Sequence, residues 1–308
     1  MRTRSWAAGV LALTLVAAAC GGDDDDAGSA DTTVAAEESA TETTMAATEA
    51  PAEGGNCDPL PVVNEGQLTV ATGDVVYPPW MGAGEADFDD PTTGTGYEGA
   101  LVFALADQLG FTPDQIEWVR TGFDEVIAPG EKDWDFNIQQ YSITPEREEV
   151  VDFSDGYYTV QQAIIGRSDS PAASATSIAD LKSLRIGAAI GTTSLDYAEQ
   201  VIAPDSEVQV YDDNAATKAA FDANQVDAIV YDLPTAYYIT AAEITDASII
   251  GILPPGDSPE ELGMLFEKGN PLVECVNAAL ATLRDDGTLD ALQQEWLAQG
   301  GDIPTLSE

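Results

Sequence analysis

The sequence contains no histidine and few basic residues. Of its 308 residues, 55 are Asp or Glu and 11 are Lys or Arg, which gives a formal net charge of −44. The lack of histidine excludes Ser-His-Asp and Cys-His nucleophile systems, HExxH zinc sites and every histidine general base. Phosphate contacts need clustered Lys and Arg, so we expect no nucleic-acid partner. The GxxxxGK[ST] motif of P-loop ATPases is missing too, and we expect neither a cofactor nor a metal.

Long hydrophobic runs are also missing. The apolar stretch of residues 7–19 follows Arg2 and Arg4 and is too short to span a bilayer. Its length is that of the hydrophobic region of a signal peptide, so we predict that residues 1–19 are one. The stretch ends in small residues followed by Cys20, which resembles the lipobox of bacterial lipoproteins. The resemblance implies a lipid on Cys20 that anchors the protein to the outer face of the cell membrane; the alternative is plain secretion with an incidental cysteine.

Residues 20–56 hold ten acidic residues, no basic residue and no aromatic residue. Val34 and Met45 are their only large apolar side chains. Such a segment cannot bury enough apolar surface to offset the entropy lost on ordering. We therefore predict a disordered acidic linker between the lipidated cysteine and a folded body.

Cysteine usage is sparse but informative. With Cys20 assigned to the lipid, Cys57 and Cys275 remain. An even pair in an exported protein favours a disulfide, which would join the start of the body to a helix near its end. The alternative is two unrelated free thiols.

The body, residues 57–308, alternates short β-rich runs with helical patterns, which predicts parallel-type sheets covered by helices. Thr144 and Pro145 have the pattern of a helix cap followed by proline at the first helical position. Two sets of units predict two lobes, with residues 57–165 in the first, 166–253 in the second and 254–308 returning to the first. The predicted strands are 67–71, 116–120, 135–141, 158–165, 185–190, 207–211, 226–231, 247–253 and 262–267, and the predicted helices are 99–109, 178–183, 215–224, 234–243, 271–286 and 288–298.

One stretch carries a family resemblance. Residues 141–147 (YSITPER), followed by 151–154 (VDFS), resemble the signature of the polar amino acid-binding proteins of ABC transporters, solute-binding family three. The resemblance extends in order over essentially all of residues 57–308. The other matching segments are 77–80 (YPPW), 96–98 (GYE), 177–185 (SIADLKSLR), 191–194 (GTTS), 226–232 (VDAIVYD), 286–289 (DGTL) and 295–297 (EWL).

This resemblance implies an α/β protein with the type II periplasmic-binding fold, in which two α/β lobes are joined by two hinge strands. It implies a small amino acid ligand held between the lobes and an ABC permease in the membrane as partner. We expect a monomer that binds its ligand without covalent chemistry.

An amino acid zwitterion needs donors for its carboxylate, and Arg147 is the candidate. Its planar fork of N–H groups matches a carboxylate, and it lies in the first turn of a predicted helix. Ser142, Thr192 and Thr193 can donate to the same carboxylate. The alternatives are a surface arginine paired with a neighbouring glutamate and a threonine that only caps a helix.

The ammonium group needs an acceptor, and Asp232 matches the position that supplies it in the family. An unpaired carboxylate in a cleft is costly unless a cation arrives, so ligand entry would satisfy it. The alternative is a helix cap ahead of Pro234.

Five further residues are candidates for the ligand side chain or the walls of the site: Asp74, Tyr77, Trp80, Tyr97 and Gln140. Aromatic faces bury ligand carbons and favour a nearby ammonium, although we expect at least one of the three aromatic residues to belong to the core. Asp74 and Gln140, together with Asn137 and Gln139 of the same region, favour a polar or cationic amino acid.

Two other functions stay open. The first is a periplasmic dehydratase of cyclic carboxylates on the same fold, with Asp74 or Glu98 as the acid. The second is a sensory module that hands its closed form to a separate receptor. The pairing of Arg147 with Asp232 favours the amino acid binder.

Overall fold

The computed structural model describes residues 57–84, 87–256, 258–297 and 302–308. The predicted signal peptide, Cys20 and the acidic linker lie outside these ranges. Among the helices in the described ranges, none combines the length and apolar character that a membrane span requires.

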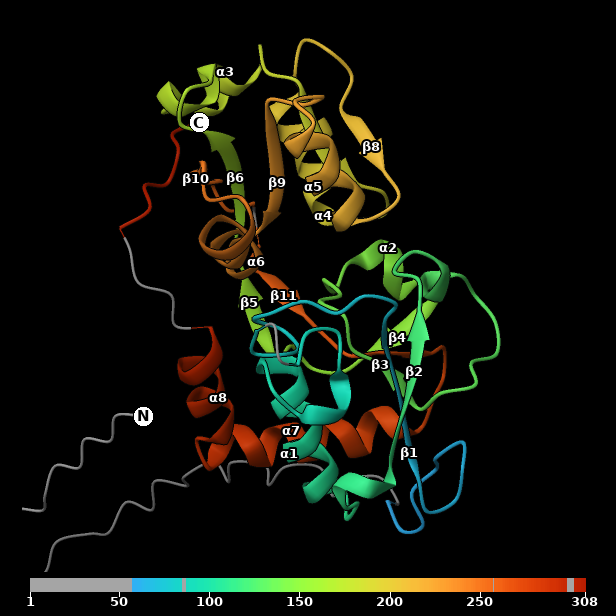
Figure 1. The fold of residues 1–308 in the computed structure, drawn as a ribbon. Coiled ribbons are helices and arrows are strands. Elements are labelled where there is room, and N and C mark those ends of the chain that lie inside the picture. Colours follow the sequence, from blue (N-terminus) through green and yellow to red (C-terminus); the bar gives the residue numbers. More distant parts are fainter. Residues whose placement is uncertain (1–56, 85–86, 257, 298–301) are drawn as a thin grey trace, which may run out of the picture. The chain divides into compact units, whose positions relative to one another are not determined.

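Five strands form the first sheet (Figure 1). The two strands β1 and β2 run parallel over six residue pairs, whereas β12 is antiparallel to both of its neighbours. Because β12 comes from near the end of the chain, the chain must return to the sheet in which it began. The order is β2 (Ile116–Thr121), β1 (Leu68–Gly73), β3 (Phe136–Asn137), β12 (Leu265–Glu267) and β4 (Val151–Phe153).

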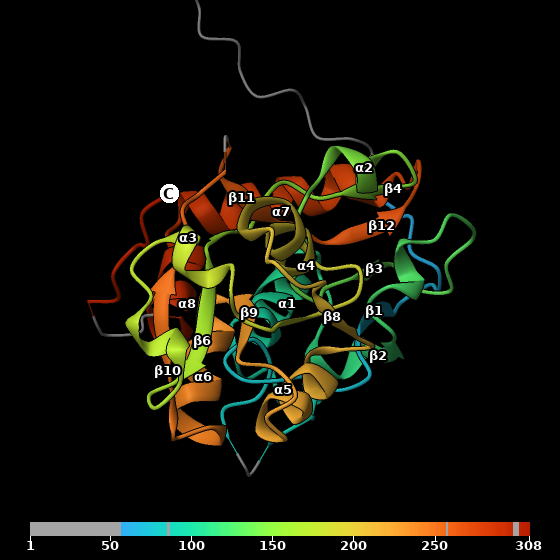
Figure 2. The same ribbon diagram turned by 90° about the horizontal axis from the view of Figure 1, so that it is seen from above.

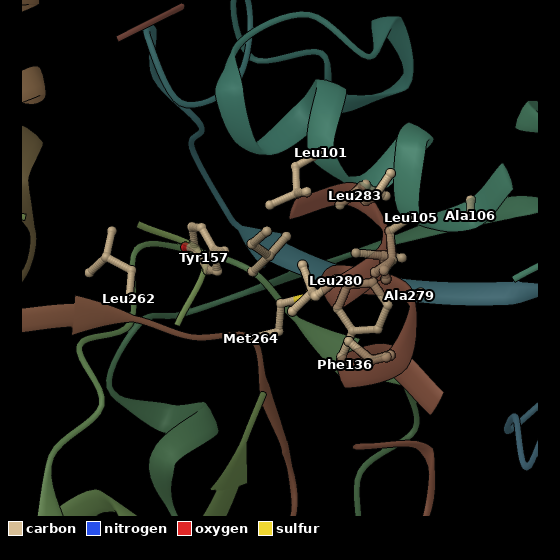
Figure 3. Packing of buried hydrophobic residues seen from close by; sticks show 14 of the residues in the cluster. Leu101, Leu105, Ala106, Phe136, Tyr157, Leu262, Met264, Ala279, Leu280 and Leu283 are labelled. Carbon is tan, nitrogen blue, oxygen red and sulfur yellow. The ribbon is translucent and has the colours of Figure 1, made fainter. Parts of the chain in front are cut away.

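Three helices cover one face of this sheet. Leu101 and Leu105 of one helix, α1, pack with Leu280 and Leu283 of another, α7, against Phe136 of β3 (Figure 3). All five side chains are buried, so each contributes roughly 1.5–3 kcal/mol of transfer free energy. The helices are α1 (Tyr97–Gln108), α7 (Leu272–Asp285) and α8 (Thr288–Trp296).

A second sheet of five strands follows in the middle of the chain, and the labels β10, β6, β9 and β8 succeed one another across Figure 2. The strand β6 is antiparallel to β9 and β10, whereas β7 is parallel to β8 and β9. The order is β10 (Ala247–Ile252), β6 (Gln162–Arg167), β9 (Ala228–Asp232), β7 (Ile186–Ala189) and β8 (Gln209–Tyr211).

Helices cover both faces of the second sheet. Successive side chains of a strand point to opposite faces, and in β9 Val230 packs with Ile178 of one helix whereas Ile229 packs with Phe221 of another. Both faces of β9 are therefore apolar, as its sequence predicts. The helices around this sheet are α3 (Ile178–Leu181), α4 (Thr193–Tyr197), α5 (Asn214–Asp222) and α6 (Leu233–Tyr238).

A separate antiparallel pair, β5 (Tyr158–Val160) with β11 (Glu260–Leu262), links the two sheets. The strand β5 leads into β6 of the second sheet, and β11 leads into β12 of the first. The single strands predicted over 158–165 and 262–267 are therefore wrong, because each run is two strands in different sheets. The change of sheet falls at Gln161 and Gln162 in the first run and at Gly263 and Met264 in the second, and a short polar or glycine interruption of this kind does not by itself end a strand.

The end of the chain lies against the second sheet. The backbone N–H of Leu306 donates to the carbonyl of Ile252, and the N–H of Ile252 donates to the carbonyl of Pro304, both at 2.9 Å. Leu306 is buried in the apolar cluster of that sheet. Residues 254–308 thus do not all return to the first lobe, and the other predicted lobe boundaries stay a prediction.

The structure joins Cys57 to Cys275 of α7 as a disulfide, with 2.04 Å between the sulfur atoms. Cys57 packs against the core under α7, and Cys275 is part of that core. The bond closes a loop with a sequence separation of 218 residues.

We predict that replacing both Cys57 and Cys275 with serine lowers the free energy of unfolding by about 3–5 kcal/mol, because a cross-link across a long loop restricts the unfolded chain. Urea unfolding of the oxidised protein and of the double variant measures the difference. Chemical reduction should lower the stability of the wild-type protein to the same level and leave the variant unchanged. Equal stability of the oxidised protein and the variant would contradict the prediction.

Candidate functional site

Arg147 lies in a short helix whose start follows the sequence pattern. The side chain of Thr144 accepts a hydrogen bond from the N–H of Arg147 at 3.2 Å, and Pro145 occupies the first turn of α2 (Pro145–Glu148). The predicted cap and proline start are therefore confirmed. Although this helix has only one turn, Arg147 is 8% exposed.

The guanidinium of Arg147 binds backbone on both sides of the candidate site. Nη1 donates to the carbonyl of Ser142 at 2.7 Å and Nη2 to the carbonyl of Gly191 at 2.8 Å. Ser142 follows β3 of the first sheet and Gly191 follows β7 of the second, so the side chain bridges the two lobes. The ring of Phe123 lies 5.6 Å from Cζ. Burial lowers the pKa of Arg147. Because the side chain is buried and bonded to backbone carbonyls, the alternative of a surface arginine paired with a neighbouring glutamate does not describe it.

The hydroxyls of Ser142 and Thr193 meet beside Arg147, 3.3 Å apart. Each donates to Oε1 of Glu260 at 2.6 Å. Nε2 of Gln162 also donates to this carboxylate, at 3.2 Å from Oε2. The hydroxyl pair that the sequence assigned to a ligand carboxylate is thus bound to a carboxylate of the chain itself.

Thr192 caps a helix, which is the alternative role that the sequence analysis gave for it. Its hydroxyl accepts from the N–H of Leu195 at 3.1 Å, which caps α4, and donates to the carbonyl of Ala189 at 2.8 Å. The structure brings Thr193, but not the hydroxyl of Thr192, to the carboxylate of Glu260.

Asp232 lies where β9 ends and α6 begins. Its carboxylate accepts from Nε2 of Gln162 at 2.8 Å, and within the described chain it makes no capping hydrogen bond to α6. Desolvation, reinforced by the negative charges of Glu260 and Glu98 and opposed by Gln162 and Arg147, raises the pKa of Asp232 to about 7. A cation beside Asp232 would remove this cost of ionisation.

A second acid with a raised pKa lies behind the site. Glu98 is fully buried and accepts hydrogen bonds from the hydroxyl of Tyr157 and from the side-chain amide of Gln140, as well as from the Gln140 backbone N–H at 2.8 Å. Burial raises the pKa of Glu98 to about 7, although these hydrogen bonds oppose the shift. The start of α1 is placed by Gly96, where φ is +81° and a Cβ would lie 2.6 Å from the carbonyl oxygen of Trp80.

The predicted wall residues divide between the site and its surroundings. Trp80 links the lobes, because its indole N–H donates to the hydroxyl of Thr235 of α6 at 2.8 Å. Tyr97 is fully buried, and its hydroxyl donates to the carbonyl of Tyr157 at 2.7 Å, which makes it the core aromatic residue that the sequence analysis expected.

The remaining three candidates make no direct contact with Arg147 or Asp232 among the described interactions. Tyr77 is half-buried with its ring 5.3 Å from that of Phe88. Asp74 is exposed. The side-chain amide of Gln140 is taken by Glu98, so its predicted role in reading a ligand side chain would require this hydrogen bond to break.

Sequence reasoning missed Gln162 and Glu260. Neither lies in a motif with known spacing, and each begins a strand next to a segment that changes sheet. The sequence offered one indication of Glu260: it is followed by a second acid, Glu261, and in a strand two adjacent side chains point to opposite faces, so one of the two acids must point inward.

The arrangement offers one buried guanidinium, two hydroxyls and two acceptor carboxylates, Asp232 and Glu260, where residues of the two lobes meet. Groups of both signs side by side suit a ligand that itself carries both charges. Gln162 and Glu260 also line a pocket whose remaining walls are residues 159–161, 197, 253–256 and 258–259.

The chain is similar to known proteins in both sequence and structure. The family model of the bacterial extracellular solute-binding proteins, family 3, matches residues 70–299. The arginine-binding extracellular protein ArtP of Bacillus subtilis (strain 168) is 28% identical over 65% of this chain and 77% of its own. The L-cystine-binding protein TcyJ of Escherichia coli (strain K12) is 29% identical over 74% of this chain and 80% of its own. Among solved structures, an ancestral arginine-binding protein bound to glutamine has a TM-score of 0.64 at 29% identity, covering 77% of this chain and 100% of that one.

We predict that Asp232→Asn changes how stability depends on pH. An acid with a pKa raised by folding stabilises the folded state while it is protonated, and this contribution is lost as the pH rises through about 7. Between about pH 5 and about pH 7.5 the ligand-free wild-type protein should therefore lose roughly 2–3 kcal/mol of stability relative to the variant.

Urea unfolding of both proteins at the two pH values measures this difference. Glu98→Gln, which removes the other acid whose pKa is raised to about 7, should likewise reduce the loss of stability over this pH range. A stability difference between Asp232→Asn and wild type that is the same at both pH values would contradict the raised pKa of Asp232.

Proposed function

Because this chain belongs to the bacterial extracellular solute-binding proteins of family 3 and has their type II periplasmic-binding fold of two α/β lobes joined by two hinge strands, we propose that it captures an amino acid between its lobes and delivers it to an ABC permease. The observation that carries the proposal is the guanidinium of Arg147 next to two hydroxyls, with the carboxylate of Asp232 on the other side of Gln162.

In the proposed complex the α-carboxylate of the ligand accepts hydrogen bonds from the side chains of Arg147, Ser142 and Thr193, and its ammonium group donates to Asp232. Hydrogen bonds to charged groups contribute roughly 1.5–3 kcal/mol each. The ligand would bridge residues of the first lobe and residues of the second, and it would stabilise the closed form by its differential affinity for the two forms.

A polar amino acid suits this site better than an apolar one. The ends of Gln162, Asp232 and Glu260 provide polar side-chain atoms around the cluster. Relatives named for the binding of arginine and of cystine are consistent with a polar ligand. Tyr77 and Trp80 are proposed as walls beside the ligand's carbon atoms.

We propose binding without turnover, in preference to a dehydratase. A dehydratase needs a protonated acid beside the leaving group, and Glu98 has a raised pKa but is enclosed by Tyr157 and Gln140. Recovery of the ligand unchanged after prolonged incubation supports the binder, whereas a dehydrated product identifies an enzyme.

We also propose that the mature protein is held at the outer face of the membrane by a lipid on Cys20 and acts as a monomer beside its permease. The observations that support this are the apolar stretch of residues 7–19 with small residues before Cys20, and the acidic linker that follows. The disulfide between Cys57 and Cys275 fits an oxidising location outside the cytoplasm.

We predict that Arg147→Ala weakens amino acid binding by about 100-fold or more, because two charge-assisted hydrogen bonds to the ligand carboxylate are lost. Calorimetric titration with the twenty amino acids, after unfolding and refolding to remove any bound ligand, measures the dissociation constants. Arg147→Lys keeps the charge without the fork and should lose part of the affinity.

The matched control is Arg185→Ala, which removes an exposed arginine bound to Asp227 of the second lobe. This control should bind like wild type. If none of the twenty amino acids binds to wild type, or if Arg147→Ala binds as tightly as wild type, the proposed function is wrong.

We predict that Cys20→Ser releases the protein from the membrane fraction of the cells that produce it, because a single serine cannot carry the lipid. Immunoblots of membrane and soluble fractions follow the protein, and metabolic labelling with a fatty acid follows the lipid. Wild type without label, or a variant that stays equally membrane-bound, would contradict lipidation.

A further inference from the structure

The carboxylate of Glu260 is the feature of the site that the amino acid clamp does not explain. It accepts from the hydroxyls of Ser142 and Thr193, which come from different lobes, and from the side-chain amide of Gln162. These contacts aim the carboxylate into the middle of the proposed binding site. A glutamate that served only as a solvated surface charge would not accept hydrogen bonds from residues of both lobes.

Strand pairing on both sides of β11 fixes the backbone position of Glu260. In β11, Glu260 pairs with Val160 and Leu262 pairs with Tyr158 of β5, and Leu262 also forms a bridge with Ser142 on its other side. Glu260 is half-buried at the strand that links the lobes, whereas its neighbour Glu261 is exposed. Alternation along the strand turns the two acids to opposite faces.

Glu260 lies close to the proposed acceptor of the ligand's ammonium group. Nε2 of Gln162 donates to Oδ1 of Asp232 at 2.8 Å and to Oε2 of Glu260 at 3.2 Å, so these two carboxylate oxygens lie within about 6 Å of each other. The amide of Gln162 is uncharged, so its hydrogen bonds to the two carboxylates do not balance their negative charges.

The charges around Asp232 are out of balance. The charged groups with the largest electrostatic effect on it are the acids Glu260 and Glu98 and the base Arg147. With Asp232 and Glu260 ionised, Arg147 balances only one of the two. An amino acid with a neutral side chain adds no net charge, an acidic one adds a further negative charge, and one with a cationic side chain restores neutrality.

We propose that Glu260 determines the charge specificity of this site, selecting an amino acid that carries a cationic side chain over neutral and acidic amino acids. The inference rests on the proposed function. When the ligand's carboxylate takes the hydroxyls of Ser142 and Thr193, the displaced carboxylate of Glu260 stays beside Asp232 and becomes a partner for the second cation of the ligand. Two like charges at this separation repel unless a cation lies between them.

The test compares Glu260→Gln with wild type by calorimetric titration of the purified protein with L-arginine, L-lysine, L-glutamine and L-glutamate. Glutamine keeps the shape of the side chain and an acceptor oxygen but removes the charge. The preference for L-arginine over L-glutamine, expressed as the ratio of their dissociation constants, should fall by about 10-fold or more, since a close charge pair contributes at least that much at the effective dielectric constant of about 20 found near protein surfaces. Glu260→Asp, which keeps the charge, should retain a preference for the cationic ligands.

Glu261→Gln is the matched control, because it makes the same change of charge at the next residue of β11 but on the exposed face, and it should leave the ratio within about 2-fold of wild type. Wild type itself should bind L-arginine or L-lysine more tightly than L-glutamine, and L-glutamate most weakly. This measurement needs no variant, so it holds even where Glu260→Gln fails to fold.

Three results would overturn the inference. Wild type could bind L-glutamine or L-glutamate at least as tightly as the cationic amino acids, or Glu260→Gln could change all four dissociation constants by one common factor, which would make Glu260 only a competitor for the hydroxyls. If wild type bound none of the amino acids, the proposed function would fail and this inference with it. The first two results leave amino acid binding intact and are thereby distinguished from the third.

Discussion

A buried guanidinium is costly unless its N–H groups find acceptors, and Arg147 finds them in the carbonyls of Ser142 and Gly191. These carbonyls follow strands of different sheets, so one side chain ties the positions of two lobes to each other. The caps of α2 and α4 and the hydroxyls of Ser142 and Thr193 are arranged around this contact. A ligand carboxylate that displaced Glu260 from these hydroxyls would meet donors already held in place, which lowers the entropic cost of binding.

The second constraint is the surplus of negative charge. Asp232 and Glu98 both have a pKa raised to about 7 by burial, and Glu260 approaches Asp232 through their shared amide donor. The site is therefore organised at the expense of stability near neutral pH, and a ligand with positive charge returns part of that free energy. The proposed recognition of a cation and the loss of stability near neutral pH would be two consequences of the same carboxylates.

Much of the fold could be predicted from the sequence because helix caps and hydrophobic periodicity are local. The helix predicted over 99–109 is α1 (Tyr97–Gln108), and the one predicted over 271–286 is α7 (Leu272–Asp285). The predictions over 158–165 and 262–267 failed because the only interruptions at the change of sheet are Gln161 with Gln162 and Gly263, and none of these residues is one that must end a strand. In the candidate site, Arg147 and Asp232 could be predicted from the family resemblance. The contacts of Glu260 were not, because they join segments more than 60 residues apart in the sequence.

The central claim is that an amino acid bridges the two lobes between Arg147 and Asp232, and a crystal structure of the protein with bound L-arginine tests it most directly. The account predicts the α-carboxylate within hydrogen-bonding distance of the Arg147 guanidinium and of the hydroxyls of Ser142 and Thr193, and the α-ammonium at Asp232. It also predicts that the carboxylate of Glu260 has left these hydroxyls. A ligand bound elsewhere, or a ligand in the site with Glu260 still on both hydroxyls, would contradict the account.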